Sequence, residues 1–150
     1  MTPQELKDKL EAIGRSVPDD IFKFSDGTNA TELNTAHHFA IRLSQEFPKY
    51  HCDFDLSKLH EVELSKRQEG KPNSGYRRPD IILHERRTHA RNFLVVEMKL
   101  RGDPATVDGD AEKIQNVWFA EPFRYEFGAT VVLNEDGCAA HVMPNPHRKA

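Results

Sequence analysis

Two apolar runs, IILH at 81–84 and FLVVEMKL at 93–100, constrain the fold of this chain more than any other feature. Successive side chains of a strand point to opposite faces, so the second run separates into two faces. One face is apolar and carries Leu94, Val96, Met98 and Leu100, while the other becomes charged along the strand and carries Val95, Glu97, Lys99 and Arg101. A face that turns polar on an otherwise buried strand is typical of a functional site in an α/β protein.

The other patterns of the chain predict an α/β (α+β) fold. Apolar residues recur at helical spacing in some stretches and alternate in others, and clusters of Gly, Pro, Asn and Asp separate them. Helices are expected at 3–13, 30–47 and 111–120, strands at 50–56, 80–84, 93–101, 129–133 and 138–143, and connecting loops at 65–76 and 101–110. The expected order is helix, helix, three strands, helix and two strands.

Composition excludes several classes of protein. A chain of 150 residues with 37% hydrophobic content fits one domain over 1–150, and no apolar run approaches the ~20 residues of a membrane span. The N-terminus lacks the basic and apolar regions of a secretory signal, so we expect a cytoplasmic protein without a membrane partner. Cys52 and Cys138 are far apart and outside any C-x-x-C motif, which argues against a disulfide framework and a cysteine zinc site.

The middle of the chain is basic although the whole protein carries a net charge of −3. Residues 66–101 hold ten Lys and Arg against four Asp and Glu, a local charge of +6. Arginines flank the first apolar run, and Arg77, Arg78, Arg86, Arg87 and Arg91 are candidates for contacts with nucleic-acid phosphates. Solvated strand ends and loops would give the same pattern, so both interpretations stay open.

A hairpin through the turn HERRTHARN would bring three charged residues together. Asp80 opens the first strand, and an antiparallel pairing places it opposite the end of the second strand, near Glu97 and Lys99. Two buried carboxylates repel unless a positive charge compensates them. Hard oxygen ligands suit Mg²⁺ or Mn²⁺, so the trio predicts a metal site that acts on a phosphate, with Lys99 orienting water or stabilising charge.

These residues resemble a known motif. Pro79 and Asp80, then sixteen residues, then Glu97-Met98-Lys99, resemble the PD-(D/E)XK nuclease superfamily with its restriction-endonuclease-like fold. The resemblance implies that Asp80, Glu97 and the main chain of Met98 bind Mg²⁺, which Mn²⁺ can replace, and that Lys99 assists the attacking water. It also implies a central mixed sheet of four to five strands flanked by helices, and hydrolysis of phosphodiester bonds, mostly of DNA.

Further positions match small stand-alone members of this superfamily across roughly 30–133. Their first helix carries an acid before a His, here Glu32 and His37, and their later helix opens with an Asp-x-x-Lys-hydrophobic pattern, here Asp110, Lys113 and Ile114. Lys113 is therefore a candidate phosphate contact. Asp110 can equally be an acid that the dipole stabilises at the start of a helix.

Glu32 has two interpretations. Asn29 and Glu32 fit a capping box, which explains Glu32 without chemistry. Helical geometry also places Glu32 roughly 60° from the centre of the apolar stripe, closer than its rival Glu46 at roughly 100°, so we prefer Glu32 as a catalytic residue.

Two functions from different classes follow. The first is an Mg²⁺-dependent nuclease acting on DNA, for which a homodimer would suit the cleavage of two strands. The second is a catalytically silent nuclease-fold module that binds nucleic acid or a protein. The intact set of Asp80, Glu97 and Lys99 favours the first, since a silent relative is expected to have lost at least one of the three.

Overall fold

The computed structural model of the protein describes residues 1–22, 32–54, 79–100, 104–134 and 136–148. Within these ranges the side chains of residues 19, 32, 33 and 104–106 are not described. The elements are α1 (Pro3–Arg15), the 3-10 turn η1 (Asp19–Ile21), α2 (Glu32–Glu46), β1 (His51–Phe54), β2 (Ile81–His84), β3 (Leu94–Leu100), α4 (Pro104–Lys113), the π-helical segment η4 (Ile114–Trp118), β4 (Phe127–Asn134) and β5 (Gly137–Pro144).

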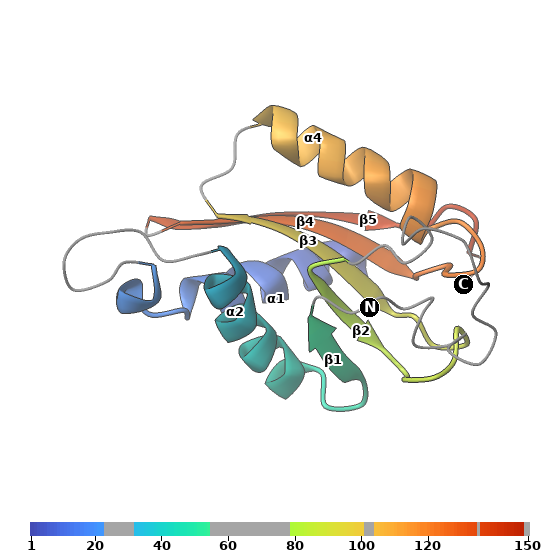
Figure 1. The fold of residues 1–150 in the computed structure, drawn as a ribbon, viewed down its shortest axis with the longest axis horizontal. Coiled ribbons are helices and arrows are strands. Elements are labelled where there is room, and N and C mark those ends of the chain that lie inside the picture. Colours follow the sequence, from blue (N-terminus) through green and yellow to red (C-terminus); the bar gives the residue numbers. More distant parts are fainter. Residues whose placement is uncertain (23–31, 55–78, 101–103, 135, 149–150) are drawn as a thin grey trace, which may run out of the picture.

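The five strands form one sheet in the order β1-β2-β3-β4-β5. All neighbours are antiparallel except β3 and β4, which run parallel because α4 crosses between them. Figure 1 shows α4 on one face of the sheet and α1 and α2 on the other. The predicted α+β class and the mixed sheet of four to five strands are therefore confirmed, and the described residues form five strands and three α-helices. No helix in the described ranges has the length and apolar character needed to cross a membrane.

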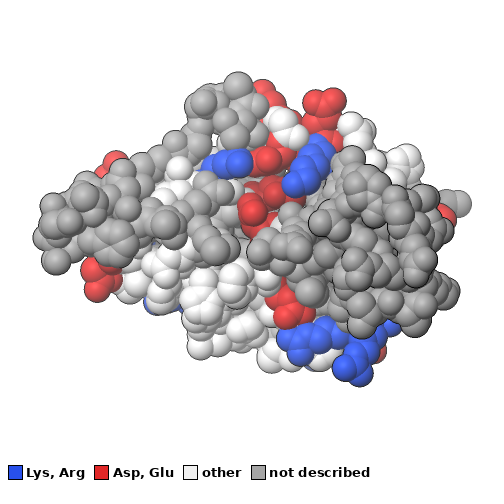
Figure 2. Space-filling view, in the orientation of Figure 1, with Lys and Arg blue, Asp and Glu red and all other residues white. Residues whose placement is uncertain are grey.

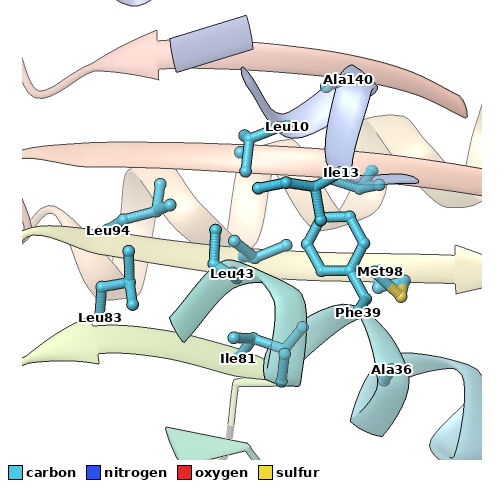
Figure 3. Packing of buried hydrophobic residues seen from close by; sticks show 14 of the residues in the cluster. Leu10, Ile13, Ala36, Phe39, Leu43, Ile81, Leu83, Leu94, Met98 and Ala140 are labelled. Carbon is cyan, nitrogen blue, oxygen red and sulfur yellow. The ribbon is translucent and has the colours of Figure 1, made fainter. Parts of the chain in front are cut away.

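The two faces of β3 lie in two separate layers of the core, as its alternation predicts. Leu94, Val96 and Met98 belong to the larger cluster under α1 and α2. Figure 3 shows Phe39 of α2 beside Met98 in this layer. Val95 belongs to the second cluster, beneath α4 and η4. This second layer also holds four aromatic residues, Trp118, Phe119, Phe123 and Tyr125.

The prediction of a loop over 101–110 is wrong for most of its length, because α4 begins at Pro104. Proline fits the first turn of a helix, where its missing N–H has no intrahelical partner anyway. Gly109 lowers the local helix preference by about 1 kcal/mol relative to alanine, and packing of the helix on the sheet overrides this cost. Asp110 is consequently not an acid at the helix start but the seventh residue of α4.

Gly128 in β4 lets the α4–η4 segment approach the sheet closely. A Cβ at this position would lie 2.3 Å from Cγ2 of Ile114 and 3.1 Å from the ring of Phe119. Both neighbours are buried, at 0% and 2% exposure, so neither can move freely. The absence of a side chain at Gly128 thus sets the spacing between η4 and the β3–β4 pair.

We expect Gly128→Ala to lower the free energy of unfolding by about 1–3 kcal/mol, because the added methyl group overpacks this layer. Gly109→Ala is the matched control, since a Cβ there meets nothing within 4 Å. That change should raise the free energy of unfolding by about 0.5–1 kcal/mol through helix preference alone. Urea denaturation of both variants measures the effects, and a Gly128→Ala protein as stable as the wild type would contradict the packing argument.

Candidate active site

Asp80 and Glu97 lie at the same end of the β2–β3 hairpin. The antiparallel register pairs Ile81 with Val96, so the next pair outward is Asp80 and Glu97. Asp80 is held there by the main chain, because its Oδ2 accepts a hydrogen bond of 2.6 Å from the N–H of Met98. The structure therefore brings the two carboxylates together, as the hairpin arrangement predicts.

Glu97 is a buried carboxylate on the face of β3 that packs under α4 and η4. Its exposed fraction is 4%. Its Oε1 accepts a hydrogen bond of 3.0 Å from Nε1 of Trp118 and lies 3.2 Å from Nζ of Lys113. Burial, and next the charge of Asp80, raise the pKa of Glu97 to about 7, while Lys113 and Trp118 act in the opposite direction. The negative charge of Asp80 thus disfavours the ionised form of Glu97.

Lys99 follows Glu97 on the same face and approaches α4. Its Nζ lies 3.9 Å from Oδ2 of Asp110, with side-chain exposures of 29% for Lys99 and 16% for Asp110. Asp110 and Lys113 stand three residues apart, which places both on one side of the helix, towards β3. Helix α4 therefore places one acidic and one basic side chain, Asp110 and Lys113, next to the charged residues of β3.

Together these residues form what we call the acid–lysine cluster: Asp80, Glu97, Lys99, Asp110 and Lys113. It combines three carboxylates with two ammonium groups. Figure 2 shows acidic side chains gathered next to basic ones in the region beneath α4. The carboxylates outnumber the lysines, so the cluster has a net negative charge when all of its members are ionised.

Two contacts of Glu97 were missed by the sequence analysis. Lys113 was assigned to phosphate binding, yet it forms an ion pair with Glu97. Trp118 packs in the second core layer, and its indole N–H also donates to Glu97. A sequence signal for the second contact existed, because a buried tryptophan N–H needs an acceptor and few acceptors occur in an apolar layer.

Glu32 is the first residue of α2, and its side chain lies outside the described part of the protein. Figure 3 shows Ala36, one turn later, towards the end of β3 that carries Met98. The start of α2 therefore lies at the same end of the sheet as Glu97, but on the opposite face. The rival Glu46 ends α2 and pairs with Lys9 of α1 at 2.6 Å on the surface. Asn29, the proposed cap, also lies outside the described residues.

The predicted phosphate-contacting arginines have different surroundings. Arg77 and Arg78 lie outside the described residues. Arg86 is held by Asp53, to which its Nε and Nη2 donate at 3.0 and 2.8 Å. Arg87 is exposed at the β2–β3 turn, with a φ of 66°. A phosphate would have to compete with Asp53 for Arg86, so its assignment to phosphate binding stays a prediction.

Asp53 is the centre of a second polar group on the same sheet face. Its Oδ2 lies 2.7 Å from Nε2 of His84, which is fully buried. Hydrogen bonds from His84 and Arg86 hold the pKa of Asp53 well below its usual range. The Asp53 carboxylate therefore has partners of its own at the end of β2 and in the turn that follows it.

No group of three or more His, Cys, Asp and Glu side chains within metal-binding distance occurs among the residues that the structure describes. The expected ligand set needs only two such side chains, Asp80 and Glu97, since its third donor is the main chain of Met98. No protein-family model matches the chain, and no curated protein matches it.

Glu97→Gln should stabilise the protein at high pH. The pKa of Glu97 in the folded protein, about 7, lies above the ordinary value of 4.5 for this side chain. The folded state therefore binds the proton more tightly, and this contribution to stability is complete below about pH 4.5 and lost as pH rises through 7. Glutamine resembles the protonated acid, so the free energy of unfolding should rise by about 1–3 kcal/mol at pH 8 and change little at pH 4.5.

Urea denaturation in EDTA at both pH values measures this difference. Glu46→Gln, at the exposed end of α2, is the control and should keep the pH dependence of the wild type. A Glu97→Gln protein that is less stable than the wild type at pH 8 would show that the ionised carboxylate is fully compensated by Lys113 and Trp118.

Proposed function

We propose that the protein is a divalent-metal-dependent nuclease that hydrolyses phosphodiester bonds, with DNA as the substrate, and that its fold is restriction-endonuclease-like. The observation that carries the proposal is the placement of Asp80 beside Glu97, with Lys99 on the same strand face. The order α2, β1, β2, β3, α4 and β4, with β3 and β4 parallel, supports the fold that the motif implies.

Asp80 and Glu97 would hold the cation. Their oxygens are the hard donors that Mg²⁺ prefers, and Mg²⁺ commonly takes one or two carboxylates together with waters and substrate phosphate. The raised pKa of Glu97 fits this assignment, because a cation between the carboxylates would remove the repulsion from Asp80. When bound, the cation would lower the pKa of a water and neutralise charge on the phosphate in the transition state.

Trp118 and Lys113 would position Glu97 for this role. Both contacts reach the same oxygen, Oε1, and fix the orientation of the carboxylate. Neither contact uses the second oxygen, Oε2, which would be the donor to the cation. Such support by neighbouring donors is the usual way in which a protein orients a metal-binding carboxylate.

Lys99 would act on the water or on the phosphate. It lies two residues beyond Glu97, about 7 Å along the same face of β3. Asp110 lies 3.9 Å from its ammonium group and keeps the side chain over this face. From this position the ammonium can donate to an attacking water and stabilise developing negative charge.

A specific observation also favours the silent binding module. Lys113 already supplies a positive charge to Glu97 at 3.2 Å, so part of the compensation expected from a cation comes from the protein itself. If this ion pair is the final partner of Glu97, the cluster is structural. The two functions differ in whether Mn²⁺ stabilises the protein and whether phosphodiester bonds are cut.

Different variants should separate the loss of metal binding from the loss of DNA cleavage. Asp80→Asn and Glu97→Gln should lose both the rise in Tm caused by Mn²⁺ and the cleavage of DNA, because they remove the ligand charges. Lys99→Ala should keep most of the rise in Tm and lose cleavage by roughly 100-fold or more. Single-stranded, nicked and duplex DNA with Mg²⁺ or Mn²⁺, and EDTA as the blank, provide the assay.

Lys9→Ala, which removes an exposed lysine paired with Glu46, is the control and should behave as the wild type. Full cleavage by Lys99→Ala would refute the nuclease proposal. If the variants lose cleavage because they no longer fold, their Tm without metal will also be lower than that of the wild type. In that case Lys99→Arg, which keeps the positive charge, is the variant whose cleavage tests the role of Lys99.

Glu32 and Glu46 can be compared directly, as acids at opposite ends of α2. Glu32→Gln keeps much of a capping hydrogen bond and removes the charge. A catalytic Glu32 predicts a loss of cleavage of roughly 100-fold, whereas a simple cap predicts near-normal activity and a change in stability within about 1 kcal/mol. Glu46→Gln should leave cleavage unchanged, and equal activity of the two variants would remove Glu32 from the active site.

A further inference from the structure

A basic pocket lies at the end of the sheet opposite the acid–lysine cluster. It has a volume of about 540 Å³ and is lined by His89, Ala90, Pro122, Arg124, His147 and Arg148. These residues come from the segments before β3, before β4 and after β5. The C-terminal end of the described chain lies at this side of the sheet in Figure 1.

The pocket is separate from the candidate active site. Asn92, whose carbonyl contacts the pocket residue Arg148, precedes Glu97 by five residues of extended chain, or about 17 Å. No residue of the acid–lysine cluster lines the pocket. A ligand in it would therefore not depend on Asp80 or Glu97.

Arg148 is fixed in the wall of the pocket. Its Nη1 donates to the carbonyl oxygens of Asn92 at 3.1 Å and of Arg124 at 3.0 Å. Among the described residues its Nε and Nη2 have no acceptor in the protein. Two hydrogen bonds from one nitrogen thus hold the guanidinium group in place. Its other N–H groups can donate to a ligand, and the planar guanidinium fixes their geometry.

Arg124 adds a second guanidinium on a constrained backbone. Its φ of 47° lies in the left-handed region, which is uncommon for residues other than glycine. The same residue supplies the carbonyl that holds Arg148. Glu121 lies 3.8 Å from its Nη1, but that carboxylate is 81% exposed, so the pair is a weak surface contact that an anion can displace.

The described residues that line this pocket include no carboxylate. His89 and His147 add two imidazole rings to the lining beside the two arginines. Besides Glu121, a second acid, Glu126, lines a smaller cleft that shares Arg148 with this pocket. The pocket itself therefore combines positive charge, N–H donors and space.

We propose that this pocket binds a phosphate group carried by a small ligand of nucleotide size. Arginine forks match the geometry of phosphate oxygens and bind them with paired, charge-assisted hydrogen bonds. A volume of about 540 Å³ exceeds what one inorganic phosphate fills and falls within the range of small-molecule sites. The proposal stands independently of the nuclease activity.

NMR titration of the ¹⁵N-labelled full chain tests the proposal with inorganic phosphate and with a nucleoside 5′-monophosphate. Both should shift the amide signals of Arg124, His147 and Arg148 in a saturable way, and sodium chloride at equal ionic strength should not. Tighter binding of the nucleotide would identify a nucleotide ligand, and equal binding would identify the phosphate alone as the recognised group. Saturable shifts confined to Lys99 and Lys113, or none, would overturn the assignment.

Arg124→Gly is the decisive variant, because glycine adopts the left-handed backbone and keeps the carbonyl that holds Arg148. It should bind the stronger of the two probes at least about tenfold more weakly, as expected for loss of a charge-assisted hydrogen bond. Arg15→Ala, at the exposed end of α1, is the matched control and should bind as the wild type does.

Glu97→Gln should also keep the affinity of the wild type, which distinguishes this pocket from the candidate active site. Equal affinity of Arg124→Gly and wild type would refute the proposal. Arg148→Ala is less suited as the only test, since it also removes two hydrogen bonds to the main chain.

Discussion

The burial of one carboxylate, that of Glu97, is the constraint around which the functional side of the molecule is organised. An ionised acid at 4% exposure in a layer of aliphatic and aromatic side chains costs several kcal/mol unless it has partners. Trp118 and Lys113 supply an N–H and a positive charge from the α4–η4 segment. These contacts require close approach of the segment to the sheet, which the missing side chain of Gly128 permits.

The two faces of the sheet therefore differ in composition and in role. The face under α1 and α2 is an apolar layer in which Met98 and its neighbours on β3 pack against Phe39 and Leu43. The other face combines an aromatic cluster with charged residues at the carboxyl end of β3. Rigid packing on the first face fixes the strand, and the strand in turn fixes the side chains that the proposed chemistry uses.

Charge is also divided along the sheet. The acid–lysine cluster lies where β3 ends, and the pocket of Arg124 and Arg148 lies where β3 and β4 begin. One site suits a cation held by carboxylates, and the other suits an anion held by guanidinium groups. The overall charge of −3 indicates neither site, because the negative and positive local charges cancel in the sum.

The sequence by itself determined the local pattern: the two faces of β3, the pairing that places Asp80 beside Glu97, and the order of the elements. A period of two residues and a short turn encode the first two features within about twenty residues, and local patterns along the chain give the order of the elements, so no distant contact is needed. Only the tertiary structure decided that α4 begins at Pro104, that Lys113 and Trp118 contact Glu97, and that three chain segments form the basic pocket. Those contacts depend on how a crossover helix packs on the sheet and how distant loops meet, and neither is written in the spacing of neighbouring residues.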